Sequence, residues 1–309
     1  MDRHRIRNSL LLLLTAAIWG VAFVAQRKGM DYVGPFTFTS VRSLIGCASL
    51  LPVIPLVSRM NRASGAPKAQ PADRRTLLLG GLCCGALLFV GSSLQQVALQ
   101  HTTVGKAGFI TALYIVIVPV IGLLRGKRCS LALWAGVLLA LAGLYLLCIN
   151  EVFTVSFNDV LLLIGAFVFS LHILFVDHFV QKVDGLRLSQ AQSLVCGLIA
   201  AIPMLLLESP RPDNLLAAWL PILYAGALSS GVGYTLQIVA QRGMHPTLVS
   251  LILSLESVIS VLAGWALLNQ RLSARELIGC ALMFTAILLA QLPGRGAKKA
   301  RSLSLEGAP

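Results

Sequence analysis

The chain of 309 residues alternates long apolar runs with short polar segments. A helix needs about 20 apolar residues to cross the roughly 30 Å hydrocarbon layer of a bilayer. Ten runs approach that length, and they cover residues 9–26, 36–57, 76–99, 104–124, 131–149, 159–179, 188–207, 216–240, 247–268 and 274–292. The runs lack the strict alternation of barrel strands, and an open strand would leave its backbone unpaired in lipid. The pattern predicts an all-α membrane protein with ten transmembrane helices.

Composition agrees with a polytopic membrane protein. Hydrophobic residues make up 57% of the chain and charged residues 12%, whereas soluble domains carry about 25% charged residues. The net charge of +13 does not indicate a nucleic-acid partner, because the basic residues lie in short segments between apolar runs. The seven cysteines form no CxxC pair, which argues against a disulfide framework or a zinc site.

Lys and Arg residues predict the orientation of the chain. With the N-terminus in the cytoplasm, the cytoplasmic segments hold about three times as many Lys and Arg residues as the opposite side. Both termini are therefore expected in the cytoplasm, and residues 293–309 are expected to form a disordered cytoplasmic tail. Many further spans follow the first apolar run, so we interpret that run as a transmembrane helix rather than a signal peptide.

The two halves of the sequence resemble each other. The segment LQQVALQ (Leu94–Gln100) aligns with LQIVAQR (Leu236–Arg242), and other segments align at similar shifts. The aligned positions include Gln95 with Gln237, Tyr114 with Glu256, Trp19 with Phe169, Ala22 with His172, and Arg42 with Gln192. Because each half holds an odd number of helices, equivalent helices must run in opposite directions. Inverted repeats of this kind are typical of transporters whose substrate site lies at the repeat interface near the bilayer midplane.

Longer segments carry a family resemblance. FITALYIVIVPVIGLLRGKRCS followed by LWAGVLLALAGLYLL is echoed by SLILSLESVISVLAGWALLNQRLS and LIGCALMFTAILL. This doubled order resembles the two EamA domains of the drug/metabolite transporter superfamily, over about residues 9–292. Ser257 departs from a common proline, and Asn269-Gln270 replace a usual Gly-Glu. The resemblance implies a first EamA repeat at 1–149, a second at 150–292, and a ten-helix carrier with a central cavity.

Glu256 is an acidic residue in the middle of the otherwise apolar or small-residue run Pro246–Leu268. A carboxylate near the centre of such a helix costs a few kcal/mol, so it is expected to be paired, hydrated or used. Burial disfavours the charged form of a carboxyl group, so Glu256 could carry a coupling proton or bind a substrate amine. The structural alternative is a carboxyl group that a neighbour satisfies and that fixes helix packing.

Arg42 lies inside the second apolar run, at a depth close to that of Glu256. Three roles are open from the sequence. The guanidinium could bind a substrate carboxylate through two hydrogen bonds, form an ion pair with Glu256, or extend outward as an anchor at the membrane surface.

Further residues are expected to line the same cavity. Gln95 and Gln237 are neutral polar residues at equivalent positions, where such residues either line a wet cavity or allow close helix packing. Trp19, Tyr114 and Tyr234 could form its aromatic walls and hold a cationic ligand.

Other polar and small residues receive narrower interpretations. His172 is a candidate proton relay or a plain structural residue, and the spacing to Asp177 and His178 does not suit a metal site. No metal and no cofactor are expected. Gly81 and Gly85 form a GxxxG pair that predicts a helix-packing face, and Lys106 is expected to be an anchor at the membrane surface.

The sequence therefore predicts a transporter without enzymatic activity in a bacterial plasma membrane, in contact with the lipid bilayer. The expected function is export of a small-molecule substrate, an amino acid or similar amphiphile, by alternating access with proton coupling as an option. The fifth and tenth helices would be peripheral and available for a homodimer. A passive channel or lipid scramblase with a polar central cavity is the alternative.

Overall fold

The computed structural model describes residues 3–63, 73–126, 129–148, 156–268 and 273–291. These residues form helices and short connections, and no β-strand occurs among them. The predicted tail at 293–309 and the Asn269-Gln270 departure lie outside the described residues.

The first half of the chain contains six helices. They are α1 (Arg3–Gly29), α2 (Pro35–Ala63), α3 (Arg74–Leu99), α4 (Val104–Ala112), α5 (Tyr114–Leu124) and α6 (Leu131–Cys148). The described residues of the second half form nine helical elements. They are α7 (Phe157–Val180), α8 (Gly185–Leu207), α9 (Pro212–Ala217), α10 (Trp219–Leu223), η1 (Tyr224–Gly233), α11 (Tyr234–Gln241), α12 (Pro246–Leu253), α13 (Glu256–Leu268) and α14 (Ala274–Gln291).

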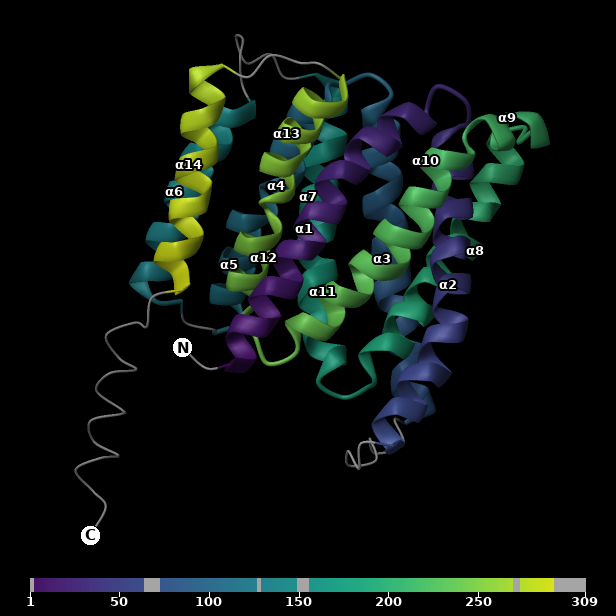
Figure 1. Cartoon of the computed structure of the whole chain (residues 1–309), viewed down its shortest axis with the longest axis horizontal. Coiled ribbons are helices and arrows are strands. Elements are labelled where there is room, and N and C mark those ends of the chain that lie inside the picture. The colour runs from purple at the N-terminus through teal and green to yellow at the C-terminus, as the bar shows by residue number, and fades with distance from the viewer. Residues whose placement is uncertain (1–2, 64–72, 127–128, 149–155, 269–272, 292–309) are drawn as a thin grey trace.

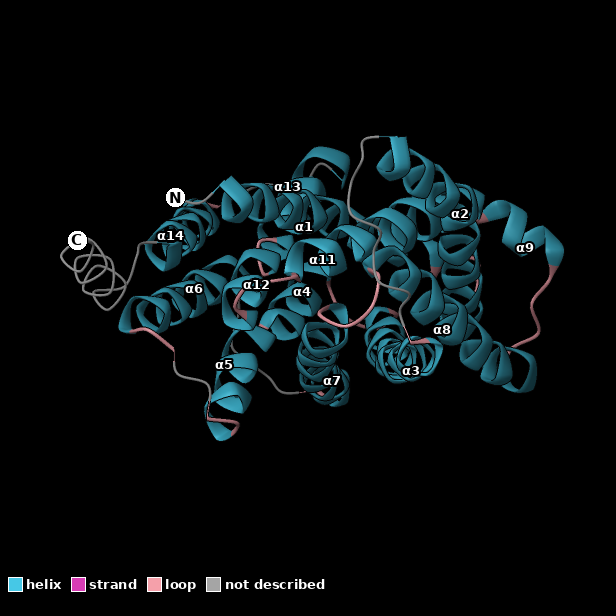
Figure 2. Ribbon diagram, turned by 90° about the horizontal axis from the view of Figure 1, so that it is seen from below, coloured by secondary structure: helices cyan, strands magenta, loops and turns pink. Residues whose placement is uncertain are grey.

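These elements form ten passages through the molecule, as the apolar runs predicted. In the described ranges, eight helical spans are long and apolar enough to cross a membrane, and some of them consist of consecutive elements such as α4 and α5. Helix α6 is a shorter apolar helix. The remaining passage is α14, which packs along α6 at one edge (Figures 1 and 2). Successive passages alternate in direction, so α1 begins and α14 ends on the same side, the lower side of Figure 1. Equivalent helices such as α1 and α7 therefore run in opposite directions, which confirms the inverted repeat.

Two of the predicted spans are interrupted near their middle. The run 104–124 is divided between α4 and α5 at Leu113, and the run 247–268 is divided between α12 and α13 at residues 254–255. Leu113 and Leu255 are equivalent positions in the two halves. At the second break, the Ser254 hydroxyl donates to the carbonyl oxygen of Leu251 at 2.7 Å, a local bond of the kind that bends helices. We therefore find broken helices where the apolar pattern predicted continuous ones.

The eighth passage contains an unusual helical segment. Element η1 is a π-helix of ten residues, YAGALSSGVG, between α10 and α11. Segments of π-helix are rare in proteins, and those that occur often lie at functional sites. Its small residues allow close packing. A Cβ atom added at Gly226 would lie 2.7 Å from Ile45 Cβ, and a Cβ atom added at Gly233 would lie 2.6 Å from the Trp19 indole nitrogen. This element therefore contacts both α1 and α2 directly.

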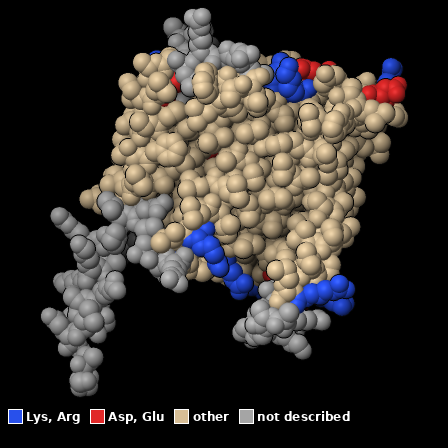
Figure 3. All heavy atoms as spheres, in the orientation of Figure 1, with Lys and Arg blue, Asp and Glu red and all other residues tan. Residues whose placement is uncertain are grey.

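The surface matches a lipid environment. Figure 3 shows Lys, Arg, Asp and Glu gathered at the upper and lower edges of one face, with a broad uncharged region between them. Large apolar side chains on the outer helices are exposed, including Leu138, Leu198 and Phe284. In water such a surface would be unfavourable, whereas lipid solvates it.

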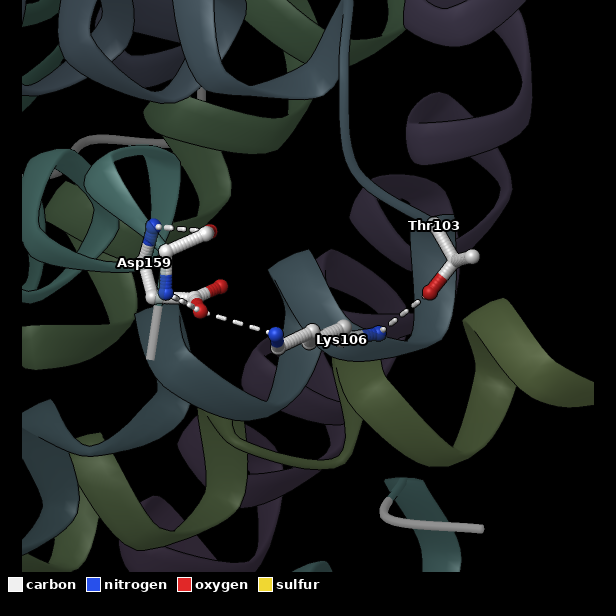
Figure 4. A network of polar contacts seen from close by, with 4 residues as sticks. Thr103, Lys106 and Asp159 are labelled. Atoms are coloured by element: carbon white, nitrogen blue, oxygen red, sulfur yellow. Dashed lines mark hydrogen bonds and ion pairs between the residues drawn. The ribbon is translucent and has the colours of Figure 1, made fainter. Parts of the chain in front are cut away.

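Charged contacts join the two halves on the upper side. The Lys106 ammonium of α4 lies 2.8 Å from the Asp159 carboxylate of α7 (Figure 4). This ion pair corrects the prediction that Lys106 is an anchor at the membrane surface, because its ammonium contacts the other repeat. The Glu208 carboxylate, at the end of α8, accepts hydrogen bonds from the Phe36 and Thr37 amides at the start of α2. An anionic group at a helix N-terminus is stabilising.

The GxxxG prediction for α3 is confirmed by its packing on α8. A Cβ added at Gly81 would lie 2.7 Å from Ala191 Cβ, and one at Gly85 would lie 2.6 Å from Val195 Cβ. The missing side chains are what let the two helices approach this closely.

We predict that Gly85→Ala lowers the free energy of unfolding by about 1–3 kcal/mol, because the added methyl group forces α3 and α8 apart. The same change at Gly105 adds a methyl group with no heavy atom within 4 Å and serves as the control. Thermal unfolding of both purified variants in detergent measures the difference. Equal midpoints for the two variants would contradict the packing assignment.

Candidate functional site

A cavity lies in the interior, between the two halves of the chain. It contains about 520 Å³ of space not filled by protein atoms, including its mouth. All eight residues that the sequence singled out line it: Trp19, Arg42, Gln95, Tyr114, His172, Tyr234, Gln237 and Glu256. The structure thus brings the predicted residues together, while their role in binding a substrate stays a prediction.

The cavity follows the internal symmetry of the chain. Most of its lining residues are paired by the repeat, each partner coming from the opposite half. The pairs are Trp19 with Phe169, Ala22 with His172, Phe23 with Ile173, Gln95 with Gln237, Thr111 with Leu253, and Tyr114 with Glu256. A cavity built in this way lies on the pseudo-twofold axis that relates the repeats.

Glu256 is satisfied by its own symmetry equivalent. The Tyr114 hydroxyl donates to Glu256 Oε1 at 2.9 Å, across 142 residues of sequence. Tyr114 is the first residue of α5, and Glu256 is the first residue of α13. The two helix breaks therefore place both side chains at the interface of the halves, with 3% and 5% of their surface exposed.

Arg42 occupies another part of the lining. Its side chain is buried, with 4% of its surface exposed, and its Nη1 donates to Gln26 Oε1 at 3.1 Å. Arg42 forms no ion pair with Glu256, although both residues are described, and its burial excludes the anchor role. The guanidinium is held in the cavity wall by Gln26, and binding of a substrate carboxylate by Arg42 stays a prediction.

Aromatic rings form one wall of the cavity. The rings of Trp19 and Tyr234 have centroids 4.7 Å apart, and His172 meets Tyr234 edge-on at 6.0 Å. The Trp19 indole donates to the carbonyl oxygen of Ser229 at 3.3 Å, which ties α1 to the π-helix. His172 Nε2 lies 3.0 Å from Gln192 Oε1, so this histidine already has a neutral partner.

The two equivalent glutamines have different surroundings. Gln95 donates to the Thr111 hydroxyl at 3.2 Å. Gln237 donates weakly to Gln241 at 3.4 Å, while its own Oε1 is buried and has no hydrogen-bond partner among the described residues. The second-half amide therefore keeps an unused acceptor beside the cavity.

Eight of the sixteen lining residues were not proposed as cavity residues from the sequence, and the polar ones among them are Gln26, Thr111 and Ser229. Gln26 follows Trp19 and Ala22 on one face of α1, so helical spacing could have identified it. Ser229 contributes through its backbone carbonyl in a π-helix, and no sequence signal indicates that. Within the described ranges, no three His, Cys, Asp or Glu side chains gather as a metal site would require.

Comparison with known proteins identifies the family. A family model described as the EamA-like transporter family matches residues 7–149 and again residues 156–292. This chain belongs to the EamA-like transporter family. The double match agrees with the inverted repeat and with the predicted membership of the drug/metabolite transporter superfamily. The protein is a multi-pass membrane transporter of this kind.

Individual relatives agree with the family. An uncharacterized transporter from Archaeoglobus fulgidus is 28% identical over 289 residues, which cover 93% of this chain and 87% of the relative. Protein PecM from Dickeya dadantii is 28% identical over 102 residues, 32% of this chain and 33% of that protein. A solved crystal structure of 20% identity superposes with a TM-score of 0.75, covering 94% of this chain and 97% of the other. At that identity the likeness shows the fold alone.

In this EamA-like transporter, the Tyr114–Glu256 contact is testable by a double-mutant cycle. We predict that Tyr114→Phe and Glu256→Leu, each of which removes the hydrogen bond, are non-additive, with a coupling energy of about 0.5–3 kcal/mol in the free energy of unfolding. Reversible unfolding in mixed micelles measures each variant and the double variant.

Tyr224→Phe provides the matched control for this cycle. The Tyr224 hydroxyl donates to the carbonyl oxygen of Ile18 at 3.1 Å, so the effect of its removal should add to that of Glu256→Leu without coupling. Additive effects at Tyr114 would show that the phenol and the carboxyl group do not interact.

Proposed function

We propose that this protein exports a small amphiphilic metabolite by alternating access through the central cavity. The observation that carries the proposal is the set of equivalent lining positions contributed by two antiparallel repeats. Inverted repeats can exchange their conformations, so that one site opens first to one side of the membrane and then to the other. The family and the relative from Archaeoglobus fulgidus that is named a transporter support transport, and the substrate and direction are our inference.

The proposed location is a bacterial plasma membrane with both termini in the cytoplasm. The excess of Lys and Arg on the side of the termini supports this orientation. The upper side of Figure 1 is then the outer side. The peripheral pair of α6 and α14 provides a lipid-facing surface on which a homodimer could form.

Glu256 is the proposed proton-coupling residue, with His172 as a second candidate. Among the described residues that line the cavity, Glu256 is the one with a carboxyl group. It lies between the two halves beside Tyr114. A carboxyl group buried there could bind a proton in one state and release it in the other. His172 has a less suitable partner, because Gln192 is a neutral amide.

A screen of small metabolites for protection against thermal unfolding should identify a ligand, since a compound that binds the folded state raises its stability. We predict that this ligand shows saturable counterflow in proteoliposomes. Flux that rises linearly with concentration would favour a passive channel, and movement of labelled lipid would favour a scramblase.

We predict that Glu256→Gln abolishes accumulation driven by a pH gradient and retains counterflow. Glutamine has nearly the same shape and can still accept from Tyr114, but it carries no proton at this position. Transport of the screened ligand into proteoliposomes, with and without a pH gradient, separates the two activities. Undiminished pH-driven accumulation would exclude Glu256 as the coupling group.

The charged contacts between the halves support a state closed on the upper side. Lys106–Asp159 and the Glu208 contact with α2 both lie there. The equivalent positions on the lower side are Leu248, Ser9 and Ser58, none of which is charged. The repeat symmetry is therefore broken in a way that favours closure of one side over the other.

We predict that Lys106→Glu slows counterflow several-fold, because two facing carboxylates destabilise closure of the upper side, whereas Lys106→Arg retains most of the rate. Arg27→Glu reverses a charge in the exposed Arg27–Asp31 pair at the end of α1 and should have little effect. Initial rates of counterflow and unfolding midpoints are measured for all three variants. Equal slowing by Arg27→Glu would contradict a gating role for Lys106.

A further inference from the structure

Arg42 is a buried positive charge without an acidic partner in the part of the chain that the structure describes. Its side chain is 4% exposed, and a guanidinium keeps its charge in proteins. The ion pairs between described residues are Arg27–Asp31 and Lys106–Asp159, both away from the cavity lining. Burying a charge without a counter-ion is costly. A guanidinium in a cavity wall is therefore expected to have a function that offsets this cost.

The neighbours of Arg42 leave one edge of the guanidinium available. Within the described chain its hydrogen-bond partner is Gln26, which accepts from Nη1. Nε is buried and has no hydrogen-bond partner there. The Phe38 ring lies 5.9 Å from the guanidinium carbon and offers no oxygen. The edge formed by Nε and Nη2 therefore keeps two parallel N–H donors, the arrangement that matches two oxygens of a carboxylate or phosphate.

We propose that Arg42 forms an anion subsite in the cavity and binds an acidic oxygen group of the transported molecule side-on through Nε and Nη2. The group is a carboxylate or a phosphate-type oxyanion, since both present two oxygens at the matching spacing. This inference deepens the proposed function by naming a charge that the substrate carries.

The rest of the cavity defines what accompanies the anionic group. Among the described residues Glu256 forms no ion pair with Arg42, and its carboxyl group accepts a hydrogen bond from Tyr114. The second half offers no equivalent cation, since Gln192 stands where the first half has Arg42 and is not among the lining residues. The rings of Trp19 and Tyr234 supply an apolar surface within the same lining. The subsite is thus single, and the ligand joins one anionic group to an apolar body.

Gln26 acts as a positioning residue for the subsite. Its side-chain oxygen holds Nη1, and its backbone oxygen accepts from Gln96 Nε2 at 3.4 Å. A neutral partner orients the guanidinium without cancelling its charge. A carboxylate at the same place would orient the group equally well and would neutralise it.

The test uses the purified full-length protein and three probes of nearly the same shape: 3-phenylpropionate, its neutral amide, and 3-phenylpropylamine. Binding is measured as the rise of the unfolding midpoint over a concentration series. We expect the dissociation constant of 3-phenylpropionate, obtained from this rise, to be at least tenfold lower than that of the amide or the amine. Phenylphosphonate serves as a fourth probe, and its ratio to 3-phenylpropionate distinguishes a phosphate-type from a carboxylate ligand.

Two variants connect that selectivity to Arg42. Arg42→Gln introduces the residue found at the equivalent position of the second half, and it should reduce affinity for 3-phenylpropionate at least tenfold. Arg42→Lys retains the charge but not the paired donors, and it should give an intermediate affinity.

Gln26→Glu supplies a readout that a merely structural arginine would not produce. We expect it to raise the midpoint of the ligand-free protein and to abolish anion selectivity, because the new carboxylate neutralises Arg42. Gln181→Glu makes the same change at an exposed position that ends α7, and it should leave the selectivity intact.

The proposal is overturned if the amide or amine binds as tightly as the anions, if no anion binds up to 100 mM, or if Arg42→Gln leaves anion binding unchanged. Counterflow assays keep this result apart from the proposed function. Arg42-dependent anion binding without saturable counterflow would contradict the proposed transport mechanism and leave the anion subsite in place. Saturable counterflow of a neutral or cationic compound that is unchanged in Arg42→Gln would contradict the anion subsite and leave the transport mechanism in place.

Discussion

The hydrogen bond between Tyr114 and Glu256 is the contact on which the interior arrangement depends. A carboxyl group in the middle of a membrane protein must be satisfied inside the protein, because lipid offers no partner. Here the partner comes from the equivalent position of the other repeat, at 2.9 Å. That contact requires both helix breaks, since each residue begins the second segment of its interrupted span. One polar constraint thus links the repeat, the broken helices and the cavity.

The scaffold is symmetric, and the chemistry lies in the departures from symmetry. Equivalent positions supply most of the cavity lining, and the proposed exchange of roles between the two halves rests on that symmetry. Tyr114 and Glu256 differ in chemistry, and so do Arg42 and Gln192. The upper side carries charged contacts whose lower-side counterparts are neutral. Departures of this kind allow a carrier to bind one ligand and to prefer one resting state.

Much of the architecture could be predicted from the sequence, because it depends on local patterns. Apolar runs located the ten passages, and an odd number of helices per half required inversion of the repeat. The cavity residues were also accessible, since polar side chains inside apolar runs are rare and their positions recur in both halves. Helix continuity was predicted less well. The apolar runs predicted neither the breaks at Leu113 and at residues 254–255 nor the π-helix η1, because hydropathy does not record backbone geometry.

The sequence by itself determined the spans, the antiparallel halves and eight of the sixteen residues that line the cavity, because hydropathy and internal repetition are properties of the chain alone. The pairing of its polar groups was decided only in three dimensions. Arg42 and Glu256 looked like partners by depth, yet Arg42 contacts Gln26 and Glu256 contacts Tyr114. A hydrogen bond depends on distances of a few ångströms and on side-chain direction. Those are set by the crossing of helices that lie far apart in the sequence.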